Sequence, residues 1–318
     1  MKAIRFHEYG DADVLRLEEV EKPSPAAGSV LIKTAVAGIN YADTMLRKGT
    51  YLTRPPLPFT PGFEVAGHVE AVGEGVEGLR VGQRVMAKMS GGGYAEYAAV
   101  KAEHVTHVPE GLEFGAATAL LAQGLTALGL LRDLKAGQSI LVHAAAGGVG
   151  SLLVQLAKLR GAYVIGTAST AEKLGLVKAL GADAAIDYTE PDWPEKVKAS
   201  SPRGAGVDLL IEMVGGEVGA RNVKCLAPGA KMIVYGAASG EDFSISALEL
   251  LRRNLTVSGY TLYIETETTL AGFTRELMSL VAEGRLKVTV EEFPLARAAD
   301  AHRAVEGRRT TGKVVLRV

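Results

Sequence analysis

The chain has few of the residues that would mark a specialised class of protein. It contains one cysteine, Cys225, in 318 residues, so it cannot form an internal disulfide or a zinc site of several thiolates. Aromatic residues make up 6%, and 35 Lys and Arg against 36 Asp and Glu leave a net charge of −1. Without a cationic excess, nucleic acid and anionic membranes are not expected partners. A single cysteine is typical of a reducing, cytoplasmic location.

We expect neither a secretory leader nor a membrane span in this sequence. Charged residues, Lys2 and Arg5, stand within its first five positions, which is unlike a secretory signal. The most apolar stretch, residues 140–157, is interrupted by Gly147 and Gly150. A strand, a glycine turn and a buried helix explain this stretch better than a membrane helix does. We therefore expect a soluble protein.

Two hydrophobic patterns divide the chain. In the first third, short apolar runs such as 29–34, 64–72 and 84–88 alternate with glycine and proline, which predicts a β-rich domain. From residue 139, apolar strands alternate with helical stretches, which predicts βαβ units and a doubly wound parallel sheet. The six expected strands are Ile140–His143, Tyr163–Thr167, Ala184–Asp187, Asp208–Met213, Lys231–Tyr235 and Thr256–Gly259.

The tail of the chain is too short to form a core of its own. It is expected to contain a helix over 268–283, followed by β-like pieces, and to return to the N-terminal domain. The sequence thus predicts an α/β protein in which 1–120 and 262–318 form the β-rich domain and 121–261 the nucleotide-binding domain.

A glycine turn, Ala144-Ala-Ala-Gly-Gly-Val-Gly150, follows the first expected strand and precedes a helix. Small residues let the backbone approach a pyrophosphate, which the helix N-terminus stabilises. Ala144 stands where such turns commonly have their first glycine, and glycine turns also serve close packing. The five further strands that follow favour nucleotide binding. The residues expected to contact the cofactor in this turn are Ala146, Gly147, Gly148, Val149 and Gly150.

The end of the second expected strand indicates which nicotinamide cofactor is used. NAD sites commonly present an acid there to the ribose, but residues 166–170 read Gly-Thr-Ala-Ser-Thr. The first acid, Glu172, lies inside the next helix beside Lys173. A missing carboxylate with a nearby lysine favours the 2′-phosphate of NADPH, although an exposed helix lysine is the plainer explanation of Lys173.

Six motifs run almost from end to end of the sequence. They are Gly38-Ile-Asn-Tyr-Ala-Asp-Thr44, Leu57-Pro-Phe-Thr-Pro-Gly-Phe-Glu-Val-Ala-Gly67, Gly92-Gly-Tyr-Ala-Glu-Tyr97, Gln123-Gly-Leu-Thr126, His143-Ala-Ala-Ala-Gly-Gly-Val-Gly150 and Thr310-Thr-Gly-Lys313. In these motifs the chain resembles zinc-free quinone oxidoreductases, the ζ-crystallin-like branch of the medium-chain dehydrogenase/reductase superfamily. The resemblance implies a GroES-like β-rich catalytic domain and a Rossmann domain with a six-stranded parallel sheet.

The zinc-ligand positions of the superfamily hold other residues here. Asn40 stands where zinc-dependent relatives have a cysteine, and Phe63, before Glu64, where they have a histidine. A catalytic zinc needs three protein ligands, so we expect no zinc site of that kind. Alcohol oxidation then loses its usual Lewis acid, whereas a conjugated acceptor needs less activation. The resemblance therefore implies NADPH-dependent reduction of quinones by hydride transfer from nicotinamide C4.

The resemblance also implies roles for single residues. Asn40 and Asp43 match the loop beside the nicotinamide ribose, and Tyr51 matches a tyrosine of the active site; these are the candidate catalytic residues. Lys173 and Tyr188 match the pair that holds the 2′-phosphate in NADPH-specific members. Each can also be an ordinary turn, packing or surface residue. The remaining expected cofactor contacts are Asn40, Thr126, Ser169, Gly236, Ala237 and Ser239.

Two other functions stay open on the sequence. An enoyl or enone double-bond reductase would use the same fold and cofactor, and ζ-crystallin-like proteins also serve as lens structural proteins and bind AU-rich RNA. The net charge of −1 argues against RNA, and the intact glycine turn argues against a purely structural role. The expected substrate is a small quinone or enone. Because relatives pair through the edge of the Rossmann sheet, we expect a homodimer formed through residues 255–259.

Overall fold

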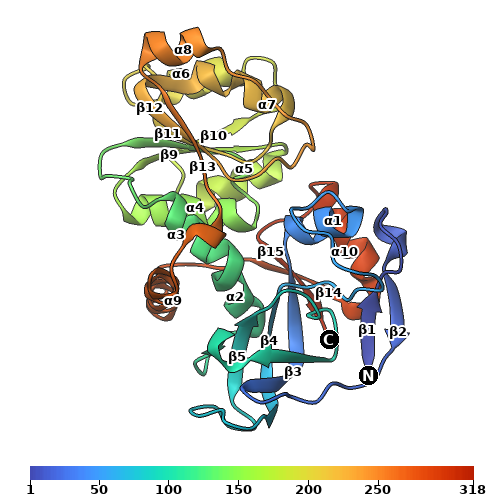
Figure 1. The fold of residues 1–318 in the computed structure, drawn as a ribbon. Coiled ribbons are helices and arrows are strands. Elements are labelled where there is room, and N and C mark those ends of the chain that lie inside the picture. Colours follow the sequence, from blue (N-terminus) through green and yellow to red (C-terminus); the bar gives the residue numbers. More distant parts are fainter. The chain divides into compact units, whose positions relative to one another are not determined.

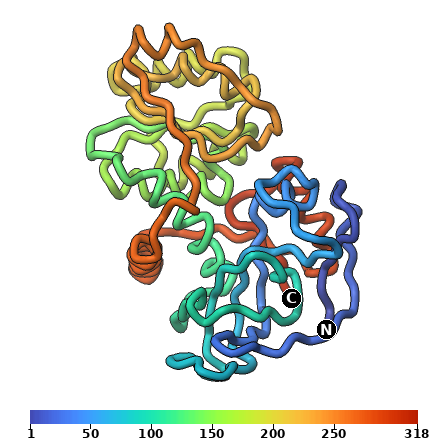
Figure 2. Tube along the Cα trace, viewed as in Figure 1, coloured from blue at the N-terminus to red at the C-terminus, as the bar shows by residue number.

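The computed structural model describes residues 1–318, which fold into two compact units. The first unit comprises Met1–Gln123 and Val288–Val318, and the second comprises Gly124–Lys287. Both ends of the chain, blue and red in Figures 1 and 2, belong to the first unit. The C-terminal strands therefore return to the N-terminal part of the chain. The interpretation of the two units as a catalytic and a nucleotide-binding domain stays a prediction.

The first unit is built on a seven-stranded sheet whose main path runs β14-β15-β3-β4-β5-β7, with β6 paired to β3. Its strands, with the small β1–β2 pair, are β1 (Lys2–Arg5), β2 (Arg16–Glu19), β3 (Ser29–Ile39), β4 (Glu64–Val72), β5 (Arg84–Lys88), β6 (Tyr97–Lys101), β7 (Val105–His107), β14 (Val290–Pro294) and β15 (Lys313–Arg317). Its helices are α1 (Tyr41–Lys48), α2 (Phe114–Ala119) and α10 (Ala298–Glu306). Most side chains of β3, β4 and β15 are buried, which explains their nearly continuous apolar sequences.

The register of β3 with its two neighbours positions several polar residues. Val314 of β15 lies opposite Ile39 of β3, and Ala37 of β3 lies opposite Val65 of β4, both in antiparallel pairs. The first residues of β4 and β15 therefore meet where β3 ends. Helix α1 begins at this same point, one residue after the extended Asn40.

The second unit is a six-stranded parallel sheet in the order β10-β9-β8-β11-β12-β13. The strands are β8 (Ser139–Val142), β9 (Tyr163–Ala168), β10 (Ala184–Asp187), β11 (Val207–Glu212), β12 (Leu226–Val234) and β13 (Thr256–Gly259). In Figure 1, α4 and α5 lie on one side of this sheet and α6 and α8 on the other. The strand order reverses between β8 and β11, which is where doubly wound sheets bind their ligands. The predicted α/β fold class is confirmed.

The helices of the second unit are α3 (Leu125–Leu130), α4 (Gly148–Leu159), α5 (Ala171–Ala179), α6 (Trp193–Ser200), α7 (Gly216–Arg221), α8 (Ala247–Arg253) and α9 (Glu267–Ala282). Helix α9 packs against α3 and belongs to this unit, whereas the sequence assigned residues 262–318 to the first. None of the helices combines the length and the apolar composition that crossing a bilayer requires.

Candidate functional site

The glycine turn joins β8 to the N-terminus of α4. Its N-cap residue, Gly147, has no side chain that could accept a hydrogen bond from the first turn of the helix, so those amides remain available to a ligand. Gly150 must be glycine, because a Cβ there would lie 2.2 Å from the Ala144 carbonyl oxygen and 2.8 Å from the Ala145 Cα. The tight turn is completed by a bond from the Gly147 N–H to the Ala144 carbonyl, 2.8 Å long. This geometry suits a pyrophosphate at the helix N-terminus.

The ends of β9 and β10 bring together the residues expected to hold the 2′-phosphate. The Tyr188 N–H donates to the Ala168 carbonyl at 3.2 Å, which places Tyr188 beside the end of β9. The Thr170 hydroxyl accepts from the Lys173 N–H at 3.3 Å and caps α5, so Lys173 lies in the first helical turn. Ser169 lies between Ala168 and this cap. The first turn of α5, which contains Lys173, and Tyr188 therefore both follow directly on the carboxyl ends of neighbouring strands. A lysine, a tyrosine and hydroxyl groups are a set that suits a phosphate.

A third loop reaches the same edge of the sheet. After β12, the Ala238 and Ser239 N–H groups donate to the carbonyls of Met213 and Val214, at 2.8 and 2.7 Å. These bonds lay the loop that contains Gly236, Ala237 and Ser239 along the segment following β11. Thr126 lies on α3 in the same unit and is half-buried. The structure thus brings the three loops to the carboxyl ends of neighbouring strands and places Thr126 on a helix.

A buried polar network that sequence reasoning missed lies directly beneath these loops. His143 Nδ1 lies 2.8 Å from Thr167 Oγ1, and His143 Nε2 lies 2.7 Å from Asn222 Oδ1. The Asn222 amide donates to Glu212, whose other carboxylate oxygen accepts the N–H groups after β11. Burial lowers the pKa of His143, so its ring is neutral and, from its partners, carries the proton on Nε2. The network ties together the ends of β8, β9 and β11.

In the first unit, the sequence candidates Asn40 and Asp43 meet at the start of α1. The Asn40 N–H donates to Asp43 Oδ2 at 2.8 Å, which caps the helix. Asp43 is fully buried, and this burial raises its pKa to about 7; the negative charge of Glu64 adds to the shift, whereas the Asn40 N–H and the Lys313 ammonium oppose it. This carboxyl group therefore changes charge near neutral pH.

Three residues that are not among the candidate site residues surround the Asn40 side chain. Asn40 Nδ2 donates to Glu64 Oε1 at 2.9 Å, and Gln123 Nε2 donates to Asn40 Oδ1 at 3.2 Å. Lys313 Nζ donates to the same Oδ1 at 3.2 Å and forms an ion pair with Glu64. Asn40, Glu64, Gln123 and Lys313 come from four different motifs of the six that carry the family resemblance. The motifs were the available signal, but nothing in them says that these residues meet.

Tyr51 lies close to the same region of the first unit. Its half-buried ring packs against Phe63, with the ring centroids 6.1 Å apart. Phe63, which precedes Glu64, stands at the position for which the resemblance implies a zinc-ligating histidine in zinc-dependent relatives. The structure contains no group of three or more His, Cys, Asp or Glu side chains that could hold a metal ion.

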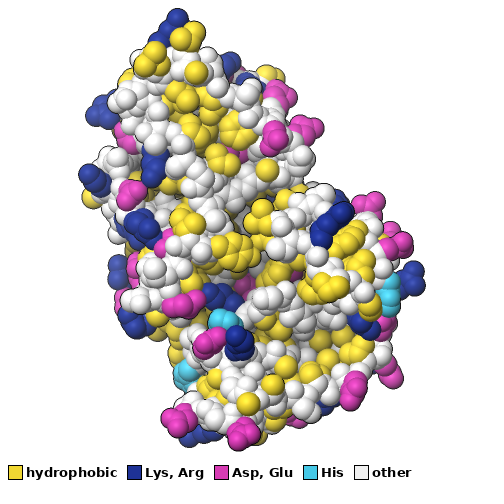
Figure 3. Space-filling view, in the orientation of Figure 1, with side chains coloured by type: hydrophobic (Ala, Val, Ile, Leu, Met, Phe, Trp, Pro, Cys, Tyr) yellow, Lys and Arg dark blue, Asp and Glu magenta, His cyan; other side chains and the backbone are white.

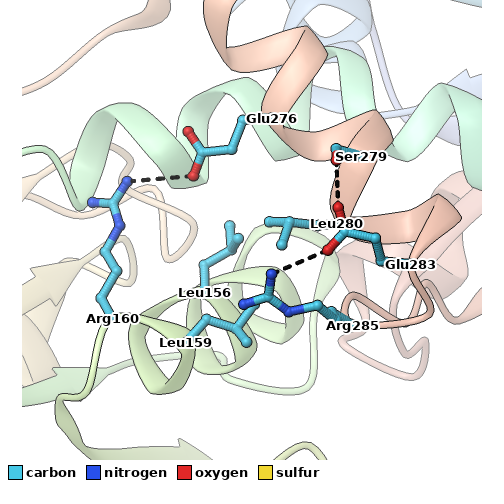
Figure 4. Close-up of a pocket in the computed structure, with 8 residues that line it drawn as sticks. All are labelled: Leu156, Leu159, Arg160, Glu276, Ser279, Leu280, Glu283 and Arg285. Carbon is cyan, nitrogen blue, oxygen red and sulfur yellow. Dashed lines mark hydrogen bonds and ion pairs between the residues drawn. The ribbon is translucent and has the colours of Figure 1, made fainter.

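A surface groove in the second unit contains none of the predicted site residues. It lies between α4 and α9, encloses about 350 Å³, and is drawn in Figure 4. Arg160 faces Glu276 at 4.0 Å, and Arg285 faces Glu283 at 3.1 Å. Because its charged side chains already pair with one another, the groove offers no unbalanced charge to a ligand.

The two units and the glycine turn define a protein of the medium-chain dehydrogenase/reductase architecture, and comparison with known proteins identifies the family. Residues 26–110 match the alcohol dehydrogenase GroES-like domain, and residues 148–277 match the zinc-binding dehydrogenase family. A probable quinone oxidoreductase of Schizosaccharomyces pombe is 38% identical over 98% of this chain and 96% of its own. The quinone oxidoreductase of Rattus norvegicus is 35% identical over 99% of this chain and 97% of its own.

Among solved structures, the Escherichia coli quinone oxidoreductase complexed with NADPH superposes with a TM-score of 0.93, at 34% identity and full coverage of both chains. The chain belongs to the quinone oxidoreductase family of the medium-chain dehydrogenase/reductase superfamily. The resemblance inferred from the six motifs is confirmed.

Proposed function

We propose that this protein is an oxidoreductase that reduces quinones with NADPH and needs no metal. The observation that carries the proposal is the edge of the parallel sheet in the second unit, where the glycine turn, Lys173 and Tyr188 lie at the ends of neighbouring strands. Full-length similarity to quinone oxidoreductases, one of them solved with NADPH, supports the same conclusion. When bound, NADPH supplies the hydride, and the protein supplies binding and orientation.

Each candidate residue has a task in this scheme. The first-turn amides of α4, at Gly148, Val149 and Gly150, bind the pyrophosphate, and Ala146 and Gly147 keep the turn small enough for it to approach. The other cofactor contacts, at the adenosine and nicotinamide ends, are Asn40, Thr126, Ser169, Lys173, Tyr188, Gly236, Ala237 and Ser239.

In the first unit, Asn40 and Asp43 orient the reacting groups, and Tyr51 donates a hydrogen bond to the substrate oxygen. Asn40 and Phe63 occupy the positions of the zinc ligands, and neither side chain is a zinc ligand. Reduction therefore proceeds without a metal, on an acceptor that conjugation has already activated.

The activity is tested by following NADPH oxidation against quinones, enones, enoyl thioesters and aldehydes under the same conditions. Quinones should give the highest kcat/KM. A clear preference for enoyl thioesters or simple enones would instead show a double-bond reductase. Oxidation of NADPH by none of the four classes would refute the proposed activity.

The choice of cofactor is tested by Lys173→Ala. A phosphate held by a lysine gains charge-assisted hydrogen bonds of roughly 1.5–3 kcal/mol, which corresponds to about a tenfold to hundredfold preference for NADPH. The substitution should raise the KM for NADPH by that factor and leave the KM for NADH nearly unchanged. Lys198→Ala, at an exposed lysine of α6, is the matched control. Equal use of NADH and NADPH by the unaltered protein would contradict the assignment.

We further propose a cytoplasmic homodimer that pairs through β13. This strand is the last of its sheet and leaves one edge open, and Val257 on it is 39% exposed. On neighbouring α8, Leu248 and Leu251 are 57% and 77% exposed. Figure 3 shows hydrophobic side chains gathered on the surface of this unit. An open edge beside exposed leucines is stabilised by pairing with a second copy about a two-fold axis.

A further inference from the structure

The core of the first unit contains a buried lysine and a buried glutamate to which the proposed mechanism gives no task. Lys313 and Glu64 are the first residues of β15 and β4 and are 1% and 0% exposed. The Lys313 ammonium donates to three acceptors, namely the Ile39 carbonyl at 3.0 Å, Asn40 Oδ1 at 3.2 Å, and Glu64. Glu64 Oε2 accepts the Ala122 N–H at 3.1 Å. Both charged groups therefore have several partners.

Stability alone does not explain such a pair. Removing two charges from water costs much of what their attraction returns, so well-packed apolar residues often stabilise a core equally well. The surrounding structure is also shaped for the carboxylate. A Cβ at Gly38 would lie 2.4 Å from Glu64 Oε1 and 2.7 Å from its Cγ, so β3 leaves room for Glu64 only because it has a glycine there.

The pair determines the orientation of the Asn40 amide. Oδ1 accepts from Lys313 and from Gln123, and one hydrogen of Nδ2 goes to Glu64. A flipped amide would set its NH2 group against an ammonium and its oxygen against a carboxylate, so one orientation is selected. The second Nδ2 hydrogen is then the group that the amide can offer to a ligand. The ammonium on Oδ1 also polarises the amide and strengthens this donor.

We propose that Lys313 and Glu64 are positioning residues that hold the Asn40 amide so that its second Nδ2–H donates to an oxygen of the bound reactants. This inference rests on the proposed function, because it takes Asn40 as a residue of the active site. The acceptor is either a ribose hydroxyl of the cofactor or the carbonyl oxygen of the quinone. A hydrogen bond to the ribose hydroxyl contributes to NADPH affinity. A hydrogen bond to the quinone carbonyl oxygen contributes to kcat, because negative charge develops on that oxygen as the hydride arrives.

A double-mutant cycle between Asn40 and Lys313 tests the proposal. The variants are Asn40→Ala, Lys313→Met and the combination, with Lys33→Met, an exposed lysine of β3, as the matched control. Lys313→Met should cost roughly tenfold, the equivalent of one hydrogen bond, in the dissociation constant of NADPH if the acceptor is the ribose, or in kcat if it is the quinone. In the Asn40→Ala background the same change should cost less than about twofold, because its effect passes through an amide that is no longer there.

The structural alternative predicts a different result. If Lys313 serves packing alone, Lys313→Met lowers the unfolding temperature but leaves kcat and NADPH affinity as in Lys33→Met, or its effect on them multiplies independently with that of Asn40→Ala. Either result for kcat and NADPH affinity would overturn the proposal. If Lys313→Met does not fold, the double variant Lys313→Met/Glu64→Gln, which removes both charges together, takes the place of Lys313→Met in the cycle. Gly38→Ala should reproduce the loss by displacing the Glu64 carboxylate, with no charge changed.

A readout without cofactor separates this inference from the proposed activity. In protein labelled with ¹⁵N-asparagine, the two Nδ2 hydrogens of Asn40 should give distinct NMR signals that move on Lys313→Met and stay in place on Lys33→Met. If no quinone supports NADPH oxidation by the unaltered protein but these signals move as expected, the proposed activity fails and the positioning network stands. If the signals do not move, the network is refuted whatever the activity.

Discussion

Replacing His302 should remove a large part of the protein's sensitivity to acid. His302 lies on α10 with no exposed surface, and its Nε2 is 3.1 Å from the Tyr94 hydroxyl. Burial lowers its pKa from 6.5 to about 3, and the nearby charge of Arg47 adds to the shift. The folded protein therefore keeps this ring neutral, whereas the unfolded chain binds a proton below pH 6.5. The contribution of the neutral His302 ring to the free energy of unfolding is therefore fully present above pH 6.5 and is lost progressively as the pH falls toward 3.

The magnitude follows from these two pKa values. In the unfolded chain His302 has its ordinary pKa of 6.5, so pH 5 lies 1.5 units below it. At roughly 1.4 kcal/mol per unit, protonation of this histidine stabilises the unfolded state by about 2 kcal/mol at pH 5. Any folded-state pKa at or below about 4 gives nearly the same result at pH 5. The burial of the ring therefore sets the size of the effect at pH 5.

The assay is urea unfolding followed by circular dichroism at pH 7, 6 and 5. Wild type should lose about 2 kcal/mol more than His302→Gln between pH 7 and pH 5. Asp43, whose raised pKa favours folding at lower pH, and His143 titrate in both proteins and cancel in the difference. His107→Gln, at an exposed histidine of β7, controls for the substitution itself. An equal loss in wild type and His302→Gln would refute the reasoning.

Three further outcomes are expected. The purified protein should hold no zinc and keep its activity in chelators, because Asn40 and Phe63 stand at the ligand positions; near-stoichiometric zinc by elemental analysis, with activity lost on its removal, would contradict this. Gly150→Ala should weaken NADPH binding by more than tenfold in calorimetric titration, since its Cβ would lie 2.2 Å from the Ala144 carbonyl oxygen and force the turn apart; unchanged affinity would show that the turn does not hold the pyrophosphate. Leu251→Glu should convert a dimer to a monomer by light scattering, because it places a charge on the exposed apolar surface beside β13; a monomeric wild type would refute the interface.

Periodicity and local signals were sufficient to predict much of this protein from its sequence. The alternation of strand and helix after residue 139 is a short-range pattern, and it predicted all six strands of the parallel sheet. The details differ: β8 ends at Val142 rather than His143, and β12 begins at Leu226, five residues before the expected Lys231. Strand ends depend on pairing with neighbours, which the sequence pattern does not contain.

The glycine turn could also be predicted, because its steric requirement is local. Gly150 is needed by atoms only six residues earlier in the chain, at Ala144. The residues expected at the 2′-phosphate follow strand ends directly, and parallel strands bring their carboxyl ends to one edge. The sequence therefore predicts that Lys173 and Tyr188 lie near the same edge. The bond from the Tyr188 N–H to the Ala168 carbonyl places Tyr188 beside the end of β9, and the role of the two residues at a 2′-phosphate stays a prediction.

The environment of Asn40 was decided by tertiary structure alone. Its partners Glu64, Gln123 and Lys313 lie 24, 83 and 273 residues away along the chain. Sequence analysis identified Asn40 by what it replaces, a zinc ligand, and gave Lys313 no task beyond its place in a motif. Only the antiparallel register of β15 on β3 carries that lysine to the start of α1. Hydrophobic periodicity specifies which face of a strand is buried, but partners so far apart in sequence are brought together only when the whole sheet assembles.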